Sequence, residues 1–170
     1  MMSYLLELMR VPSIKRLKLG PEERLSVAFA NTLRAHTLNG RLTGTWFHVP
    51  NEGKRSPAYG AVLRAMGLLP GVPDYAFLTS DGGYLLELKA GRNKQTPHQL
   101  MFERWCGRGS VPYRVVRSIE EAETQLSRWG ILVSDRVLSD TKSTKPTYSQ
   151  PDQRLSYTEG LPNPKEEPEN

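Results

Sequence analysis

With 170 residues, 38% of them hydrophobic, and a formal net charge of +5, the chain suits one globular domain with one modest core. No run approaches the roughly 18 consecutive apolar residues of a membrane span, and the mixed charge of the opening segment argues against a signal peptide. A single cysteine, Cys106, excludes an internal disulfide framework and a cysteine-rich metal site. We therefore expect a soluble protein from a reducing, intracellular compartment such as the cytoplasm, without membrane contact.

The first half of the chain predicts two helices and a strand. Residues 1–19 combine an apolar opening with a basic stretch and are interpreted as an N-terminal extension. Pro21 and the two glutamates after it are typical of a helix start, and apolar residues then recur at helical spacing, which predicts a helix near 21–36. Strand-forming residues predict a strand over 45–49, and a second helix is expected to end at Gly67.

A β-hairpin is predicted next, and further elements follow it. Its strands are expected over 74–79 and 84–90. Two helices are predicted over 96–107 and 118–126, with a strand over 111–117 between them. The first of these helices has an apolar stripe made of Leu100, Met101 and Trp105.

The distribution of charge separates the C-terminal end from the rest of the chain. Residues 135–170 are polar and rich in proline, a composition that cannot bury enough apolar surface to offset chain entropy, so we expect a disordered tail. Residues 140–170 hold four basic and six acidic residues, which leaves 19 basic and 12 acidic residues, a net of +7, in residues 1–139. Such a body favours a polyanionic partner such as DNA, although mild basicity also serves solubility alone.

The hairpin turn places three charged residues on one face. With Asp81-Gly82 as a two-residue loop, Asp74 lies opposite Lys89, and Glu87 is a diagonal neighbour of Asp74. The Cβ atoms of the two carboxylate residues would lie roughly 7 Å apart or less, which leaves room for a divalent cation. The other face carries apolar side chains and is predicted to face the core: Tyr75, Phe77, Tyr84, Leu86 and Leu88.

Two interpretations of this charged face are open. Two carboxylates supply the hard oxygen ligands that Mg²⁺ prefers, and a lysine on the same face can orient a water or stabilise charge on phosphorus. This chemistry suits phosphodiester hydrolysis. The alternative is an ordinary cluster of exposed ion pairs at a strand end, which is the commoner arrangement when hairpin geometry alone is considered.

A longer series of motifs favours the first interpretation. The chain carries Gly71-Val72-Pro73-Asp74 and Leu86-Glu87-Leu88-Lys89, preceded by Phe47-His48-Val49-Pro50-Asn51, Arg55 and Met66-Gly67, and followed by Gln99, Ser118-Ile119-Glu120-Glu121-Ala122 and Trp129-Gly130. In this order, over roughly residues 20–131, the series resembles a stand-alone VRR-NUC domain of the PD-(D/E)xK nuclease superfamily. The departures from the family pattern are mild: Ser26 stands where glutamine is common, and no proline follows Lys89.

This resemblance implies a fold, an activity and partners. The fold would be α/β, with a mixed α+β sheet and a restriction-endonuclease-like αβββαβ core with flanking helices, over residues 20–134. The activity would be Mg²⁺- or Mn²⁺-dependent endonuclease cleavage of DNA, including structured or branched forms, by a homodimer. The alternatives are a catalytically silent nucleic-acid-binding module, and a protein that contacts a replication or repair protein through its tail.

The resemblance also assigns roles to residues. Asp74 and Glu87 would bind the metal, helped by the backbone carbonyl of Leu88, and Lys89 would be the catalytic lysine. Glu22 aligns with an acidic residue of the family's first helix that completes the metal site in many members. Glu23 is the near competitor, and either glutamate could instead serve the helix dipole.

Gln99 matches a catalytic glutamine that often follows the lysine in this family. Its spacing from Thr96 is also that of a capping box, with Pro97 at the first helical position. Both roles are compatible, because such a cap would set Gln99 beside the end of the hairpin.

Loop and core residues complete the predictions. Contacts with phosphate are considered for Asn51, Lys54, Arg55, Arg92 and Lys94, and are favoured for the last two because they directly follow the catalytic strand. The first three are equally compatible with a solvated loop. His48 is predicted to be a partly buried histidine rather than a metal ligand, and Cys106 a packed small side chain rather than a reactive thiol.

Overall fold

A computed structural model describes residues 10–11, 18–50 and 56–134 of the chain. Its elements are α2 (Pro21–Leu38), β1 (Thr45–His48), α3 (Pro57–Ala65), β2 (Tyr75–Thr79), β3 (Gly82–Leu88), α4 (Pro97–Arg108), β4 (Tyr113–Val116) and α5 (Ile119–Arg128). The expected mixed α+β fold with an αβββαβ order is confirmed, with α3 inserted after β1 and α5 added after β4. None of the helices in the described ranges is long and apolar enough to cross a membrane.

Several predictions lie outside these ranges. They concern the loop residues Asn51, Lys54 and Arg55, the tail over 135–170, and most of the extension over 1–19. The structure therefore does not test them, and the domain boundaries stay predictions.

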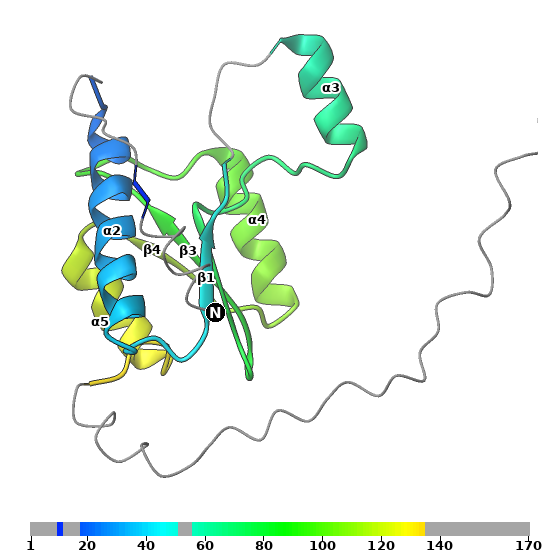
Figure 1. Cartoon of the computed structure of the whole chain (residues 1–170). Helices are drawn as coiled ribbons and strands as arrows, with labels where there is room; N and C mark the ends of the chain where they lie inside the picture. The colour runs from blue at the N-terminus through cyan, green and yellow to red at the C-terminus, as the bar shows by residue number, and fades with distance from the viewer. Residues whose placement is uncertain (1–9, 12–17, 51–55, 135–170) are drawn as a thin grey trace, which may run out of the picture.

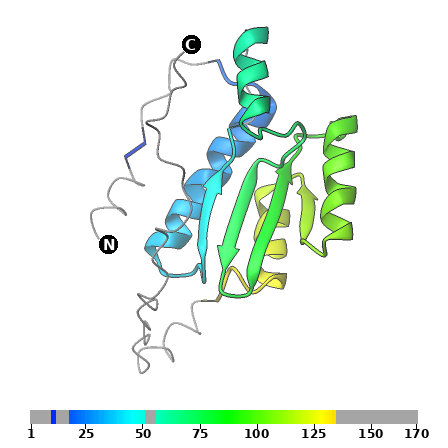
Figure 2. The ribbon, with the colours of Figure 1, turned by 90° about the vertical axis from the view of Figure 1, so that its right-hand side faces the viewer.

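The four strands form one sheet in the order β1-β2-β3-β4 (Figure 2). β1 and β2 are antiparallel, as are β2 and β3, whereas β3 and β4 are parallel. A parallel pair cannot be joined by a tight turn, and α4 makes the required crossover. As a result, the end of β3 and the start of α4 meet at the same end of the sheet.

Helices cover the sheet on two sides (Figure 1). α2 and α5 lie on one side, and α4 lies on the other. The buried core lies between the sheet and the α2–α5 layer: Phe29, Leu33, Tyr75, Phe77, Leu86, Leu88, Val116, Ala122, Leu126, Ile131 and Leu132. His36 of α2 and Glu123 of α5 also meet there, at 2.6 Å. The predicted apolar face of the hairpin is thus confirmed as the core face.

The predicted register of the hairpin is wrong by two residues. Thr79 pairs with Gly82, so the two-residue loop is Ser80-Asp81 instead of Asp81-Gly82. An Asp-Gly loop of the primed type needs positive φ at both positions, whereas in the structure only Gly82 has it, at 137°. The Thr79 side chain closes this turn, since its hydroxyl accepts from Asp81 N at 3.1 Å and donates to Gly82 O at 3.3 Å.

The shift changes which residues face each other but not which face they share. Side chains alternate along a strand with a period of two, so a two-residue shift returns every side chain to the same side. Continuing the observed register, in which Tyr75 pairs with Leu86, sets Asp74 directly opposite Glu87. The two carboxylates are therefore nearer neighbours than the predicted diagonal pair.

The predicted apolar stripe of α4 does not face the core. Leu100, Met101 and Trp105 are 42%, 65% and 60% exposed. Instead, α4 packs through Cys106, which is buried as predicted, and through the half-buried Phe102. α3, in turn, has no buried residue at all. This side of the molecule therefore presents apolar side chains to solvent.

Candidate active site

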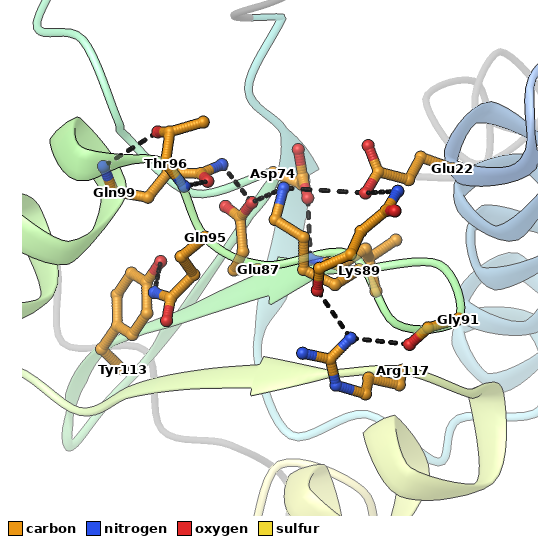
Figure 3. A network of polar contacts seen from close by, with 12 residues as sticks. Glu22, Asp74, Glu87, Lys89, Gly91, Gln95, Thr96, Gln99, Tyr113 and Arg117 are labelled. Carbon is orange, nitrogen blue, oxygen red and sulfur yellow. Dashed lines mark hydrogen bonds and ion pairs between the residues drawn. The ribbon is translucent and has the colours of Figure 1, made fainter.

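The charged residues of the hairpin come together at one end of the sheet (Figure 3). Asp74 immediately precedes β2, Glu87 lies in β3, and Lys89 immediately follows β3. The backbone N–H of Leu88 donates to Asp74 Oδ2 at 2.7 Å, which ties the two strands at this point. The N-terminal turn of α2 brings Glu22 to the same place, with Glu22 Oε1 3.7 Å from Lys89 Nζ.

Glu87 is a buried carboxylate whose two oxygens differ. The residue is 0% exposed. Oε1 lies 2.9 Å from Lys89 Nζ and also accepts a hydrogen bond from Gln99 Nε2. Oε2 has no hydrogen-bond partner among the described residues. A buried charged oxygen without a partner is costly, so this position is suited to a cation or a proton.

The pKa values of both buried groups are raised, which favours the neutral form of Glu87 and the charged form of Lys89. Burial and the neighbouring charge of Asp74 raise the pKa of Glu87 to about 7, against the lowering effect of Lys89. Burial lowers the pKa of Lys89, but its hydrogen bond and charge contact with Glu87 and the charges of Glu22 and Asp74 outweigh this, so its pKa is raised. Lys89 is therefore positively charged at neutral pH.

The structure separates the roles of the two candidate glutamates. Glu23 Oε2 accepts from the backbone N–H of Gly20 at 2.6 Å and so caps α2. Glu22 points to the site, where its Oε1 also accepts from Asn93 Nδ2 at 3.1 Å. Of the two, Glu22 is thus the one beside Lys89.

The loop after β3 is held near the site. Arg117 Nη1 donates to the backbone oxygens of Gly91 and Asn93, both at 2.8 Å. Arg92 and Lys94 are exposed on this loop. The anchoring roles of Asn93 and Arg117 were missed by the sequence analysis. The sequence offered no signal for these contacts, because Arg117 stands 26 and 24 positions from Gly91 and Asn93.

Gln99 takes part in both of its predicted contacts. The backbone N–H of Thr96 donates to Gln99 Oε1 at 2.8 Å, and Gln99 N donates to Thr96 Oγ1 at 3.3 Å, which completes the capping box. The other end of the same amide, Nε2, contacts Glu87. The cap therefore fixes which amide atom faces Glu87, because Oε1 is already engaged.

Replacing Thr96 by alanine is expected to destabilise the protein by about 1 kcal/mol, since the first turn of α4 loses its side-chain acceptor. Urea unfolding followed by circular dichroism measures this change. Thr96→Ser is the matched control, because it keeps the hydroxyl and should retain most of the stability. Equal losses in the two variants would contradict a capping role for the hydroxyl.

A cavity of about 320 Å³ opens beside Asp74. It is lined by Leu19, Glu22, Glu23, Ser26, Val27, His48, Pro50, Asp74 and Leu88. The predicted partial burial of His48 is wrong: β1 is an edge strand, so its side chain is exposed, with the ring edge-on to Tyr75 at 5.2 Å. This cavity gives a ligand access to Asp74.

The donor set fits one hard divalent cation. The described residues contain no group of three or more His, Cys, Asp or Glu side chains arranged to hold a metal. However, Mg²⁺ is commonly bound through only one or two carboxylates, with waters and substrate phosphate oxygens completing its shell. Asp74 and Glu87 form such a pair, and Glu87 Oε2 is the buried oxygen that lacks a partner.

The chain is similar to a solved structure described as a "VRR_NUC domain protein", with a TM-score of 0.49 and 17% sequence identity, covering 69% of this chain and 94% of that chain. No family model matches the sequence, and a comparison with curated proteins finds no match.

Proposed function

We propose that the chain is a metal-dependent nuclease of the VRR-NUC kind, which hydrolyses phosphodiester bonds of DNA as an endonuclease. The observation that carries this proposal is the buried Glu87, with one oxygen bound by Lys89 and Gln99 and the other without a partner, opposite Asp74. An ordinary surface ion-pair cluster would leave these groups exposed to water, whereas Glu87 and Lys89 are 0% and 7% exposed. Burying charges is expensive, and active sites are where proteins tolerate this cost.

In this proposal Asp74 and Glu87 hold Mg²⁺ or Mn²⁺, with the carbonyl of Leu88 and the carboxylate of Glu22 as further ligands. A bound divalent cation would polarise a phosphoryl oxygen and lower the pKa of a water. Lys89 places a fixed positive charge beside Glu87, where it stabilises negative charge that develops on the phosphate. Gln99 keeps Glu87 in its orientation, because its own amide is fixed by the α4 cap.

The positive charge of the chain favours DNA as the substrate. The body of the chain is basic, and Arg92 and Lys94 are exposed on the loop that Arg117 holds beside the site. Basic side chains at this position would contact phosphates next to the cleaved bond. Structured or branched DNA, a homodimeric assembly and a replication or repair partner for the tail belong to the same proposal.

Cleavage of a DNA panel tests the proposal. Purified protein is incubated with plasmid, linear, flapped and four-way DNA in Mg²⁺, in Mn²⁺ and in EDTA. We expect cleavage that needs the metal and that is lost in Asp74→Asn, which keeps the size of the side chain but removes its negative charge. Salt-sensitive DNA binding without cleavage in either metal would support a catalytically silent nucleic-acid-binding module instead.

A further inference from the structure

An apolar groove runs along α4 and includes Met101 and Trp105 of its predicted apolar stripe. Its volume is about 340 Å³. It is lined by Leu69, Pro70, His98, Met101, Phe102 and Trp105. One wall is thus the segment before β2, and the other is α4. Three of the lining side chains, Leu69, Met101 and Trp105, are 43%, 65% and 60% exposed, so the groove is open to a ligand.

Both walls are connected to the candidate active site. Gly71 presses against the first turn of α4: a Cβ at this position would lie only 2.4 Å from the backbone C and O of His98. Three residues further on, the same segment reaches Asp74. The α4 wall begins at His98, and the next residue, Gln99, contacts Glu87 through its amide. Figure 1 shows the connection from α3 to β2 passing the start of α4.

The groove combines an aromatic surface with positive charge. The ring of Trp105 stands edge-on to that of Phe102, with 5.7 Å between the ring centroids, and the centroid of Phe102 lies 6.5 Å from that of Tyr113. The exposed indole therefore packs against Phe102, which in turn lies beside Tyr113. Arg104 and Arg108 are exposed and lie three residues from Met101 and Trp105, respectively, which puts them beside the groove on the helix surface. An aromatic face flanked by arginines is the arrangement that binds single-stranded nucleic acid.

We propose that this groove binds an unpaired base of the DNA strand, stacked on Trp105, about two to three nucleotides from the phosphate at the active site. The inference rests on the proposed function and adds a substrate feature to it. A paired base inside a duplex is already stacked on both sides and does not expose a face to the indole, so the groove selects DNA with a single-stranded segment. Along the axis of α4, Trp105 lies about 9 Å from Gln99, or between two and three stacked nucleotides of about 3.4 Å each.

The charges that flank the groove and its position favour a DNA strand over a neighbouring protein as its ligand. A neighbouring protein would have to cover Arg104 and Arg108 with matching acidic groups, whereas a DNA strand brings phosphates with every base. The groove also lies close to the candidate active site, because its lining residue His98 directly precedes Gln99, and Gly71, which follows its lining residue Pro70, packs against the backbone of His98.

Binding measured in EDTA tests the inference without cleavage. The probes are a blunt duplex and the same duplex with a single-stranded extension. We expect Trp105→Ala to raise the Kd for the extended duplex about tenfold and to leave the blunt duplex unchanged, because stacking on one base is lost. Trp105→Phe should retain most of the affinity. Tyr59→Ala is the matched control, since Tyr59 is an exposed aromatic residue of α3, 55% exposed, outside the groove.

Fluorescence gives a second measurement. Trp46 and Trp129 are half-buried, so quenching of the tryptophan emission by a single-stranded oligonucleotide should disappear in Trp105→Phe. Equal binding of both probes by Trp105→Ala and by the unmodified protein would overturn the inference. So would a dimer, seen by analytical ultracentrifugation, that dissociates in Trp105→Ala, because a second copy would then fill the groove. Cleavage without any Trp105 effect contradicts only the groove, whereas Trp105-dependent binding without cleavage contradicts only the nuclease.

Discussion

Replacing Lys89 by alanine is expected to lower the rate of metal-dependent DNA cleavage by about 100- to 1000-fold. Lys89 Nζ lies 2.9 Å from Glu87 Oε1, and its raised pKa keeps it charged throughout the neutral range. The ammonium group can therefore supply a positive charge to the reacting phosphate without any change in its own protonation. Its burial matters as well, because a charge shielded from water acts more strongly on its neighbours than an exposed one does.

Two controls distinguish catalysis from folding. Arg128→Ala removes an exposed positive charge from α5, on the other side of the sheet, and should leave the rate unchanged. Lys89→Met keeps most of the side-chain volume and should be as inactive as Lys89→Ala. Thermal unfolding shows whether each variant is folded at the assay temperature. If folded Lys89→Met cleaves DNA as fast as the unmodified protein, Lys89 has no catalytic role.

The stability of the metal-free protein is expected to fall as pH rises from about 4.5 to about 7. Glu87 has a pKa of about 7 in the folded protein against 4.5 as its ordinary value, so the folded state holds its proton more tightly than the unfolded state does. Between these two pH values the unfolded chain binds fewer protons, and the free energy of unfolding decreases with pH. The full loss is about 3 kcal/mol and is complete above pH 7.

Glu87→Gln is the variant that isolates this effect. Glutamine does not titrate, so this contribution to the pH dependence of unfolding, measured with urea in EDTA, should be absent in the variant. Adding Mg²⁺ above pH 7 should raise the stability of the unmodified protein more than that of Glu87→Gln, because the cation would give Glu87 Oε2 its missing partner. Parallel pH profiles for the two proteins would show that Glu87 ionises normally in the fold.

The parts of the site that follow from strand periodicity could be predicted from sequence. Asp74, Glu87 and Lys89 were placed on one face, and they remain there although the register shifted by two residues. The shift itself could not be foreseen, since Asp81-Gly82 is a strong turn signal and the alternative depends on the side chain of Thr79 closing a different loop. The face of the sheet on which a side chain lies is thus easier to predict than the residue with which it pairs.

Features that depend on packing between distant segments were harder to predict from the sequence. The stripe of Leu100, Met101 and Trp105 has helical spacing, but spacing does not say which face of a helix meets the sheet. The choice between Glu22 and Glu23 also needed the fold, because both stand in the first turn and only contacts with Lys89 and Gly20 separate them. The capping box at Gln99 could be predicted from the sequence, because it involves residues only three positions apart.

The parallel pairing of β3 and β4 has a consequence for how the protein folds. Glu22 and Gln99 stand 77 positions apart in the chain, and α4 reaches its place only when the crossover to β4 is made. Contacts between distant positions form late, since the entropy of the intervening chain must be lost first. We therefore expect Glu87 to remain hydrated and ordinarily acidic in partly folded forms. The carboxylates of Asp74 and Glu87 would come together, shielded from water, only in the last steps of folding. A newly made chain would therefore gain its capacity to hold a cation at the same time as its full tertiary structure.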